Sequence, residues 1–511
     1  MSFVLAVDIG STQLRCFAFN KQAKPIASCF SPVIVIHPET GASEIEPEEI
    51  WNTFKTTVKD TLDAGELNPK DAVSLGVTCQ RNSFLLWNRA SGQPLCNIIT
   101  WQDRRSAPYC DRLNGCLPLH LLHMFSSVAY FFTRSNRFLL GSVAKFVPVQ
   151  VAPRLYWALH NIPHAFELAE KGELCFGSLD SWMLWKLTDG KVHATDYTNA
   201  SSTLLFDPFY LCWSDLMLTL LGIPKSILPE VKDTSGDFGT VSKDIFGAEI
   251  PICCLVADQQ SALFAQCCWD MGDIKASLGT GTFLDINTGS YVHASTSGIY
   301  PLIAWKIGPE ICYIAECHSP STGSVVEWAK QFGLFEDVAD TEKIARSVAD
   351  SGGVTFVPAF DGMVVPYEDP TATAVILGLN HKTQKEHVLR ALLESFAFQL
   401  TYLRSMLRKE LHFPVKPIKV DGGVANNNFV LQLACDLMRE TIQRPDNLDM
   451  TVLGATFLAG LAVEFWDRDE LRKFWTLKNS FSASDKGLCI KEESAYREWL
   501  RASERTCNWY Q

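Results

Sequence analysis

The sequence predicts an α/β protein built from two similar lobes. An apolar run at residues 3–7 ends in a turn at 8–12 that holds a carboxylate, a glycine and two hydroxyls, and an extended stretch follows. A related turn lies about halfway along the chain, at residues 278–282, and an apolar run again follows it. With 511 residues, the chain is also longer than one hydrophobic core usually organises. Two strand–turn–strand units in the two halves of a long chain therefore indicate two lobes.

The first half of the chain predicts a mixed sheet with helices packed on it. The run 32–36 continues the strand pattern of the N-terminal hairpin, and residues 48–62 have the spacing of an amphipathic helix that begins just after Pro47. Residues 72–78 predict a buried strand, and 84–87 predict another that is closed by a turn. This β-β-β-α-β order is typical of a mixed sheet covered by helices.

The second half begins with an almost continuous apolar strand at residues 251–257, after which Asp258 starts a helix rich in small residues. We place the domain boundary just before this strand, which divides the chain into lobes 1–248 and 249–511. A long helix is expected at 386–411, and a strand at 417–420 that ends in Asp421-Gly422-Gly423.

The composition argues against some classes of binding partner and predicts a cellular compartment. A net charge of −12 argues against a nucleic-acid partner and against attraction to anionic lipids. The seventeen cysteines are scattered and form no C-x-x-C pair, which predicts reduced thiols and a cytoplasmic protein without a secretory signal. The segment 117–151 is rich in Leu, Phe and Val, but Arg134, Arg137 and Lys145 interrupt it. We therefore expect a buried or interface helical region there and no membrane span.

Three glycine turns are candidate phosphate contacts, namely those at 8–12, 278–282 and 421–423. Backbone near glycine can approach a phosphate closely, and the carboxylate of Asp8 could associate with a metal ion. No G-x-x-x-x-G-K-[ST] motif occurs, so the chain is not a P-loop protein. Each turn taken singly is more often an ordinary turn, whereas the three in this order suggest a nucleotide between lobes.

The ends of two buried strands carry candidate substrate groups. Asp258 could accept the proton of an attacking alcohol, although a carboxylate at this position also suits a plain helix cap. Arg81 and Asn82 follow another buried strand and offer polar groups for several hydroxyls, and Trp101 could wall a carbon skeleton. The alternative for Trp101 and the arginines after it is a core tryptophan beside a surface basic pair.

Taken together, these motifs resemble the FGGY carbohydrate kinases, and within them the glycerol kinases, over nearly the whole chain. The stretches at 130–135 and 278–289 look closest to a divergent animal branch of the glycerol kinases. The motifs that carry the resemblance are the Asp8 turn, 176–182, 195–201, 257–260, 279–282, 357–360, 393–395, 420–423 and 427–428.

The resemblance implies two actin/hexokinase-like (ribonuclease H-like) lobes with ATP and Mg²⁺ in the cleft between them. It implies transfer of a phosphoryl group from ATP to a terminal hydroxyl of glycerol, giving sn-glycerol 3-phosphate, with Asp258 as base and Asp8 as the metal-associated carboxylate. Matching positions assign the polyol to Arg81, Asn82, Trp101, Asp258, Gln259 and Phe283. They assign the nucleotide to Ser11, Thr12, Arg15, Thr280, Gly323, Gly423 and Asn427.

The polyol side departs from the glycerol kinase pattern. Asn82 stands where these enzymes have Glu, and the amide loses a charge-assisted contact that is roughly twice as strong as a neutral one. Val149 stands in place of a substrate tyrosine, Arg154 in place of a lysine, and Glu368 in place of a cleft tryptophan. Two alternatives therefore stay open: a kinase of another small polyol or sugar, and a weakly catalytic nucleotide-binding regulator. A homo-oligomer and association with the mitochondrial surface also stay open.

Overall fold

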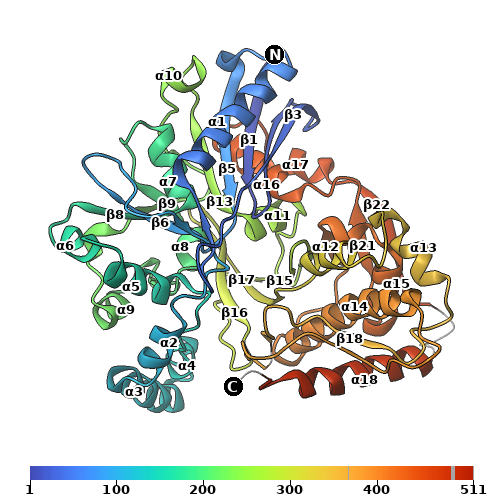
Figure 1. The fold of residues 1–511 in the computed structure, drawn as a ribbon. Helices are drawn as coiled ribbons and strands as arrows, with labels where there is room; N and C mark the ends of the chain where they lie inside the picture. The colour runs from blue at the N-terminus through green and yellow to red at the C-terminus, as the bar shows by residue number, and fades with distance from the viewer. Residues whose placement is uncertain (366, 485–489, 510–511) are drawn as a thin grey trace.

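The N-terminal half is organised by a five-stranded sheet in the order β13-β5-β1-β2-β3 (Figure 1). The structure is a computed structural model and describes residues 1–365, 367–484 and 490–509. β1 pairs in parallel with β5, which pairs in parallel with β13, whereas β2 and β3 continue the sheet antiparallel. The strands are β1 (Phe3–Ile9), β2 (Gln13–Phe19), β3 (Pro25–Pro32), β5 (Ala72–Cys79) and β13 (Ile252–Ala257).

Helices cover both faces of this sheet because the strands are apolar on both sides. α1 (Pro47–Ala64) and α7 (Leu179–Leu187) pack on one face, where they share a core with Leu5 and Val7. α11 (Asp258–Ala265) and α16 (Met450–Ala462) pack on the other face, although α16 comes from near the C-terminus. The core around α11 and α16 also holds side chains of the second sheet, so these two helices join the halves.

The C-terminal half repeats this sheet topology. Its seven-stranded sheet has the order β16-β17-β15-β14-β20-β21-β22, and β14 is antiparallel to β15 and parallel to β20, as β1 is to β2 and β5. The matching topology confirms the prediction of two similar lobes. The strands are β14 (Ile274–Leu278), β15 (Thr282–Gly289), β16 (Tyr300–Ile307), β17 (Glu310–Ser319), β20 (Ile418–Asp421), β21 (Ile442–Pro445) and β22 (Leu477–Phe481).

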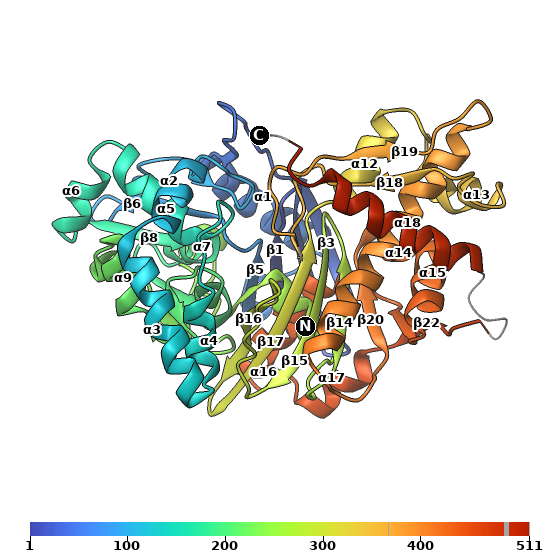
Figure 2. The same ribbon diagram turned by 90° about the horizontal axis from the view of Figure 1, so that it is seen from below.

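Helices of the second lobe pack on the seven-stranded sheet and enclose its core. Figure 2 shows α14, α15 and α18 together in the second lobe, on the right of the view. The helices are α12 (Gly323–Gln331), α13 (Thr341–Arg346), α14 (Lys385–Glu410), α15 (Asn428–Met438) and α18 (Ile490–Thr506), with a short turn of 3₁₀ helix, η4 (Gly423–Asn426), before α15.

The structure differs from three sequence predictions about the first lobe. Its third strand is β3 (Pro25–Pro32), not the run 32–36, because residues past Pro32 leave the sheet and make only one isolated bridge. β13 pairs with β5, so the first sheet extends past the boundary expected at residue 249. The strand predicted at 84–87 exists but belongs to a separate four-stranded sheet of β4 (Glu44–Ile45), β7 (Ile98–Ile99), β6 (Phe84–Asn88) and β8 (Leu174–Ser178).

A helical segment at the edge of the first lobe also differs from expectation. Residues 117–151 form α3 (Leu117–Thr133), α4 (Asn136–Ser142) and a following loop, as the helical prediction required. The apolar side chains on the outer face of α3 are exposed, however, because α4 and α2 contact α3 without covering that face. Within the described residues no single helix is long and apolar enough to cross a membrane, and α2 (Ala107–Asn114) and α3 reach that length only as a pair bent by 56°.

Candidate active site

The first glycine turn lies between β1 and β2 and is built around the buried carboxylate of Asp8. Oδ2 of Asp8 accepts hydrogen bonds from Arg15 Nη2 at 2.6 Å and from Thr451 Oγ1 at 2.7 Å. Nη1 of Arg15 donates to Asp449 at 2.8 Å, so the start of α16 closes over the turn. Oδ1 of Asp8 is buried and has no partner among the described residues, which leaves one carboxylate oxygen for a further ligand.

The part of this turn that carries the hydroxyl residues, Ser11 and Thr12, lies beside the four-stranded sheet. Ser11 Oγ donates to Gln80 at 3.2 Å and accepts from the indole nitrogen of Trp101 at 3.0 Å. Thr12 is exposed, and its side chain is therefore accessible to a ligand. Trp101 thus contacts the first glycine turn, and its backbone amide donates to Ser83 at 3.1 Å, next to Asn82 in the sequence.

The second glycine turn, between β14 and β15, is closed by the start of α12. The amide of Gly323 donates to the carbonyl of Gly279 at 2.9 Å, and that of Thr322 donates to the carbonyl of Thr280 at 3.0 Å. A Cβ at Gly323 would lie 2.5 Å from the Gly279 oxygen, so only glycine allows this approach. Thr280 and Gly323, predicted from separate motifs, therefore form one surface.

The third glycine turn lies against the second. Gly422 has φ of +89°, and a Cβ there would meet the backbone of Leu278 at 2.6 Å. Gly423 is exposed, and its Cβ position is open space. Asn427 caps α15, accepting from the amides of Phe429 and Val430, and its Nδ2 donates to Thr341 at 3.2 Å. Both the oxygen and the nitrogen of the Asn427 side chain thus already make hydrogen bonds within the protein.

The polyol-side residues meet where β5, α11 and the second sheet converge. Arg81 follows β5, and its Nη2 donates to both oxygens of Glu316 on β17, at 2.9 and 2.7 Å. Its Nε lies 3.7 Å from Oδ1 of Asp258 at the start of α11. No described residue accepts from Nη1 of Arg81, so this nitrogen is free to donate to a hydroxyl of a substrate.

Asp258 is the first residue of α11, and Ala257 occupies the cap position before it. Burial raises the pKa of the Asp258 carboxyl, the positive charge of Arg81 opposes that rise, and the negative charge of Asp8 adds to it. Among the described residues, the Asp258 carboxylate accepts hydrogen bonds only from Gln259, from the backbone amide at 2.8 Å and from the side-chain Nε2 at 3.5 Å. About a quarter of the Asp258 side-chain surface is exposed. A carboxylate with a raised pKa is a stronger base, and the exposed part of Asp258 is accessible to a ligand.

A buried chain of polar contacts joins the polyol side to the third turn. Lys275 on β14 donates to Gln259 Oε1 at 2.7 Å and to Ser277 Oγ at 2.9 Å, and it pairs with Asp285 at 2.8 Å. Ser277 in turn donates to the carboxylate of Asp421, next to Gly422. The sheet of the second lobe therefore positions Gln259 and the third turn through one set of buried charges.

The apolar wall and Asn82 complete the polyol side. Phe283 on β15 stacks on His318, with ring centroids 5.2 Å apart, and the Arg81 guanidinium lies 5.6 Å from the Phe283 ring centre. Asn82 has φ of +63°, and its buried Oδ1 has no partner among the described residues. Its carbonyl is held by the buried guanidinium of Arg154, at 2.7 Å.

Sequence reasoning missed four residues of this site. Glu316 orients Arg81, Lys275 orients Gln259, and Asp449 and Thr451 bind Arg15 and Asp8. Glu316 carried a usable signal, since it is a lone carboxylate within the apolar strand 311–317. Lys275 carried a similar signal, since it is a lone cation within the apolar strand 274–278. Asp449 and Thr451 carried none, because Arg15 and Asp8 lie more than 400 residues away from them in the sequence.

The donor set at Asp8 fits Mg²⁺. The ion typically takes one or two protein carboxylates and completes its shell with water and phosphate oxygens. Asp8 provides an unpartnered, buried carboxylate oxygen at the phosphate turn. Among the described residues there is no group of three or more His, Cys, Asp or Glu side chains that could hold a metal without such additional ligands.

Comparison with known families agrees with this geometry. The N-terminal domain model of the FGGY family of carbohydrate kinases matches residues 3–131 and 132–265, and the C-terminal domain model matches 274–463. The chain belongs to the FGGY family of carbohydrate kinases.

Relatives cover the full length of the chain. It is 44% identical to the human protein named glycerol kinase 5, over 99% of this chain and 96% of that protein. It is 36% identical to glycerol kinase 2 of Thermotoga maritima, over 100% and 99% of the two chains. A crystal structure of Plasmodium falciparum glycerol kinase with ADP superimposes with a TM-score of 0.84 at 29% identity, covering 100% and 99%.

Proposed function

We propose that this protein is an ATP-dependent glycerol kinase, which transfers the γ-phosphoryl group of ATP to a terminal hydroxyl of glycerol and releases sn-glycerol 3-phosphate and ADP. The observation that carries the proposal is the position of Asp258, whose partly exposed carboxylate lies 3.7 Å from Arg81 and within the electrostatic influence of Asp8. A base, a hydroxyl-binding cation and a phosphate turn thus converge. Relatives named glycerol kinase support the choice of polyol.

In this proposal, the residues near Asp258 bind the polyol and those of the glycine turns bind the nucleotide. Arg81 and Gln259 hold hydroxyls, Phe283 and Trp101 wall the carbon skeleton, and Asp258 takes the proton of the attacking hydroxyl. The exposed hydroxyl of Thr12 and the surface formed by Thr280 and Gly323 bind phosphates, and Gly423 lies open toward the adenosine side. Mg²⁺ held through Asp8 would neutralise charge on the transferred phosphoryl group.

The test is glycerol-dependent ATP consumption by the purified protein, compared with Asp258→Asn. The variant keeps the shape of the side chain but cannot accept the proton, so we expect kcat to fall by roughly 10²- to 10⁴-fold. Asp233→Asn is a suitable control because Asp233 pairs with Lys306 outside the cleft. Full activity of Asp258→Asn would remove the base assignment, and no activity of the wild type would remove the proposed function.

A second candidate is phosphorylation of a different small polyol or sugar. It rests on Asn82, whose buried Oδ1 has no partner among the described residues and could accept from a substrate hydroxyl. Steady-state kinetics with glycerol and a panel of polyols and ketoses separates the candidates, since the first requires glycerol to have the highest kcat/KM. We further propose a cytoplasmic location, because the described cysteines are free thiols.

A further inference from the structure

The outer face of α3 carries seven exposed large apolar side chains that the proposed active site does not use. Leu117 and Phe132 at its two ends are 70% and 78% exposed. Other exposed apolar side chains of α3 lie between these two, recur at helical spacing, and form one continuous stripe along the helix. The residues of this stripe, the α3 face, are Leu117, Leu121, Met124, Phe125, Val128, Phe131 and Phe132.

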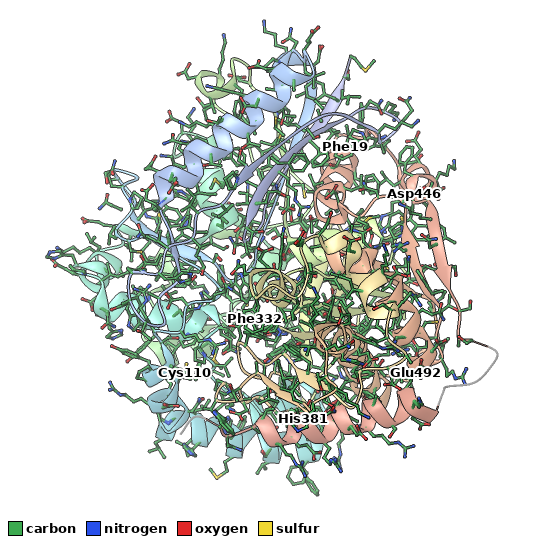
Figure 3. All side chains as sticks on the ribbon, turned by 45° about the vertical axis from the view of Figure 1, so that its right-hand side comes forward. Phe19, Cys110, Phe332, His381, Asp446 and Glu492 are labelled. Atoms are coloured by element: carbon green, nitrogen blue, oxygen red, sulfur yellow. The ribbon has the colours of Figure 1, made fainter. Side chains whose placement is uncertain are left out.

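The α3 face lies at the margin of the molecule. In both Figure 1 and Figure 2, α3 lies at the outer edge of the first lobe. The neighbouring α4 reaches the second lobe, because Asn136 donates to the hydroxyl of Tyr291 at 2.6 Å and to the carbonyl of Val292 at 2.8 Å. Figure 3, in which Cys110 marks α2, shows side chains of this helical region projecting from the lower edge. The helix that carries this face has 17 residues and spans about 25 Å.

The charges around the α3 face differ from those of the chain as a whole. The protein has 57 acidic residues, yet no Asp or Glu lies between Asp111 and Glu167. Arg112 and Arg134 flank the two ends of α3, and among the described residues neither has an acidic partner, only tyrosine or phenylalanine rings. Arg137 pairs with Asp207, and Lys145 lies 3.7 Å from Glu368.

We propose that the α3 face binds the surface of an anionic lipid bilayer, with its apolar stripe among the acyl chains and Arg112 and Arg134 at the headgroups. A helix with an exposed Leu/Phe face flanked by arginines suits this interface, because the guanidinium groups can reach the phosphates while the rings are buried. The local positive charge supplies the attraction to anionic lipid that the net charge of −12 does not.

A second copy of the chain fits this face less well. A homodimer through α3 would bring the arginines of two copies together, and the segment holds no carboxylate to pair with them. An anionic bilayer neutralises both arginines and covers the stripe at the same time. The charge distribution therefore favours lipid.

The test is flotation of the full chain with phosphatidylcholine vesicles that contain or lack 30% phosphatidylserine. We expect binding to the anionic vesicles, at least tenfold weaker binding to the neutral ones, and weakening with salt. Leu121→Gln/Phe125→Gln/Phe132→Gln should abolish binding, whereas Phe332→Gln/Leu379→Gln, at exposed apolar positions outside this region, should not change it. Arg134→Gln should weaken binding, and Arg134→Lys should restore it.

Light scattering on the same variants tests the alternative, in which a second copy of the chain covers the α3 face. A wild type that stays free of vesicles but forms a dimer, which the triple variant converts to a monomer, would overturn the lipid proposal in favour of self-association. A wild type that neither floats nor dimerises, or a control variant that loses binding as the triple variant does, would also overturn it. Retained circular dichroism and kinase activity would show that the triple variant is folded.

Discussion

Arg81 donates through one nitrogen, Nη2, to both carboxylate oxygens of Glu316, and this pair joins the end of β5 in the first sheet to β17 in the second. The contact uses the two protons of Nη2 and directs Nε toward Asp258, at 3.7 Å. The remaining nitrogen, Nη1, is left for a substrate. Glu316 thus acts as a positioning residue for the group that we expect to bind the polyol.

Replacing Glu316 tests this relationship. In Glu316→Gln, Arg81 loses its charged acceptor and a charge-assisted bond, so we expect the KM for the polyol to rise about tenfold. The KM for ATP should change little, because the nucleotide turns do not contact Glu316. Glu310→Gln is the matched control, since it removes the same charge from the same strand but pairs with Arg468. Equal changes in both KM values would instead indicate a general structural effect.

The pH dependence of the reaction should report the environment of Asp258. Its carboxyl must be ionised to accept a proton, and its pKa is raised by burial. The kcat/KM for the polyol should therefore fall with decreasing pH at a higher pH than for an ordinary aspartate. Because Arg81 opposes the rise, Arg81→Gln should move this acidic limb to higher pH. A limb that stays in place or moves down would contradict the assignment of Asp258.

Removing the charge of Asp8 should weaken the use of Mg²⁺. In Asp8→Asn the unpartnered oxygen is still polar but no longer anionic, so we expect kcat to fall by about 100-fold and half-activation to require more Mg²⁺. Asp449→Asn serves as the comparison, because Asp449 also binds Arg15 but is partly exposed. A titration with MgCl₂ measures both. Unchanged Mg²⁺ dependence in Asp8→Asn would exclude Asp8 as a metal ligand.

Two glycines of the nucleotide turns should respond differently to the same substitution. Gly323→Ala forces a Cβ to within 2.5 Å of the Gly279 oxygen, so we expect a loss of stability of about 1–3 kcal/mol and a higher KM for ATP. Gly423→Ala places its Cβ in open space, so Tm should not change, while the KM for ATP should rise if adenosine lies there. Thermal unfolding and ATP kinetics separate these effects. A similar fall of Tm in both variants would contradict the prediction.

The local order of strands and turns could be predicted because it depends on short-range patterns. The turn after β1, the helix that starts at Asp258 and the glycine turn after β20 all lie where the apolar runs and glycines indicated. The matching topology of the two sheets follows from these repeated units. The strand prediction for residues 32–36 was wrong, because a short apolar stretch after a proline does not reveal whether it pairs with a neighbouring strand.

The sequence by itself determined that this chain forms two similar α/β lobes and that glycine turns, a carboxylate and an arginine stand at the ends of their strands. Only the tertiary structure decided which residues complete the site, because Glu316 and Thr451 lie hundreds of residues from Arg81 and Asp8 and meet them only when the lobes pack. It also decided that the apolar helix α3 is exposed, since burial depends on what packs against a helix and not on its composition.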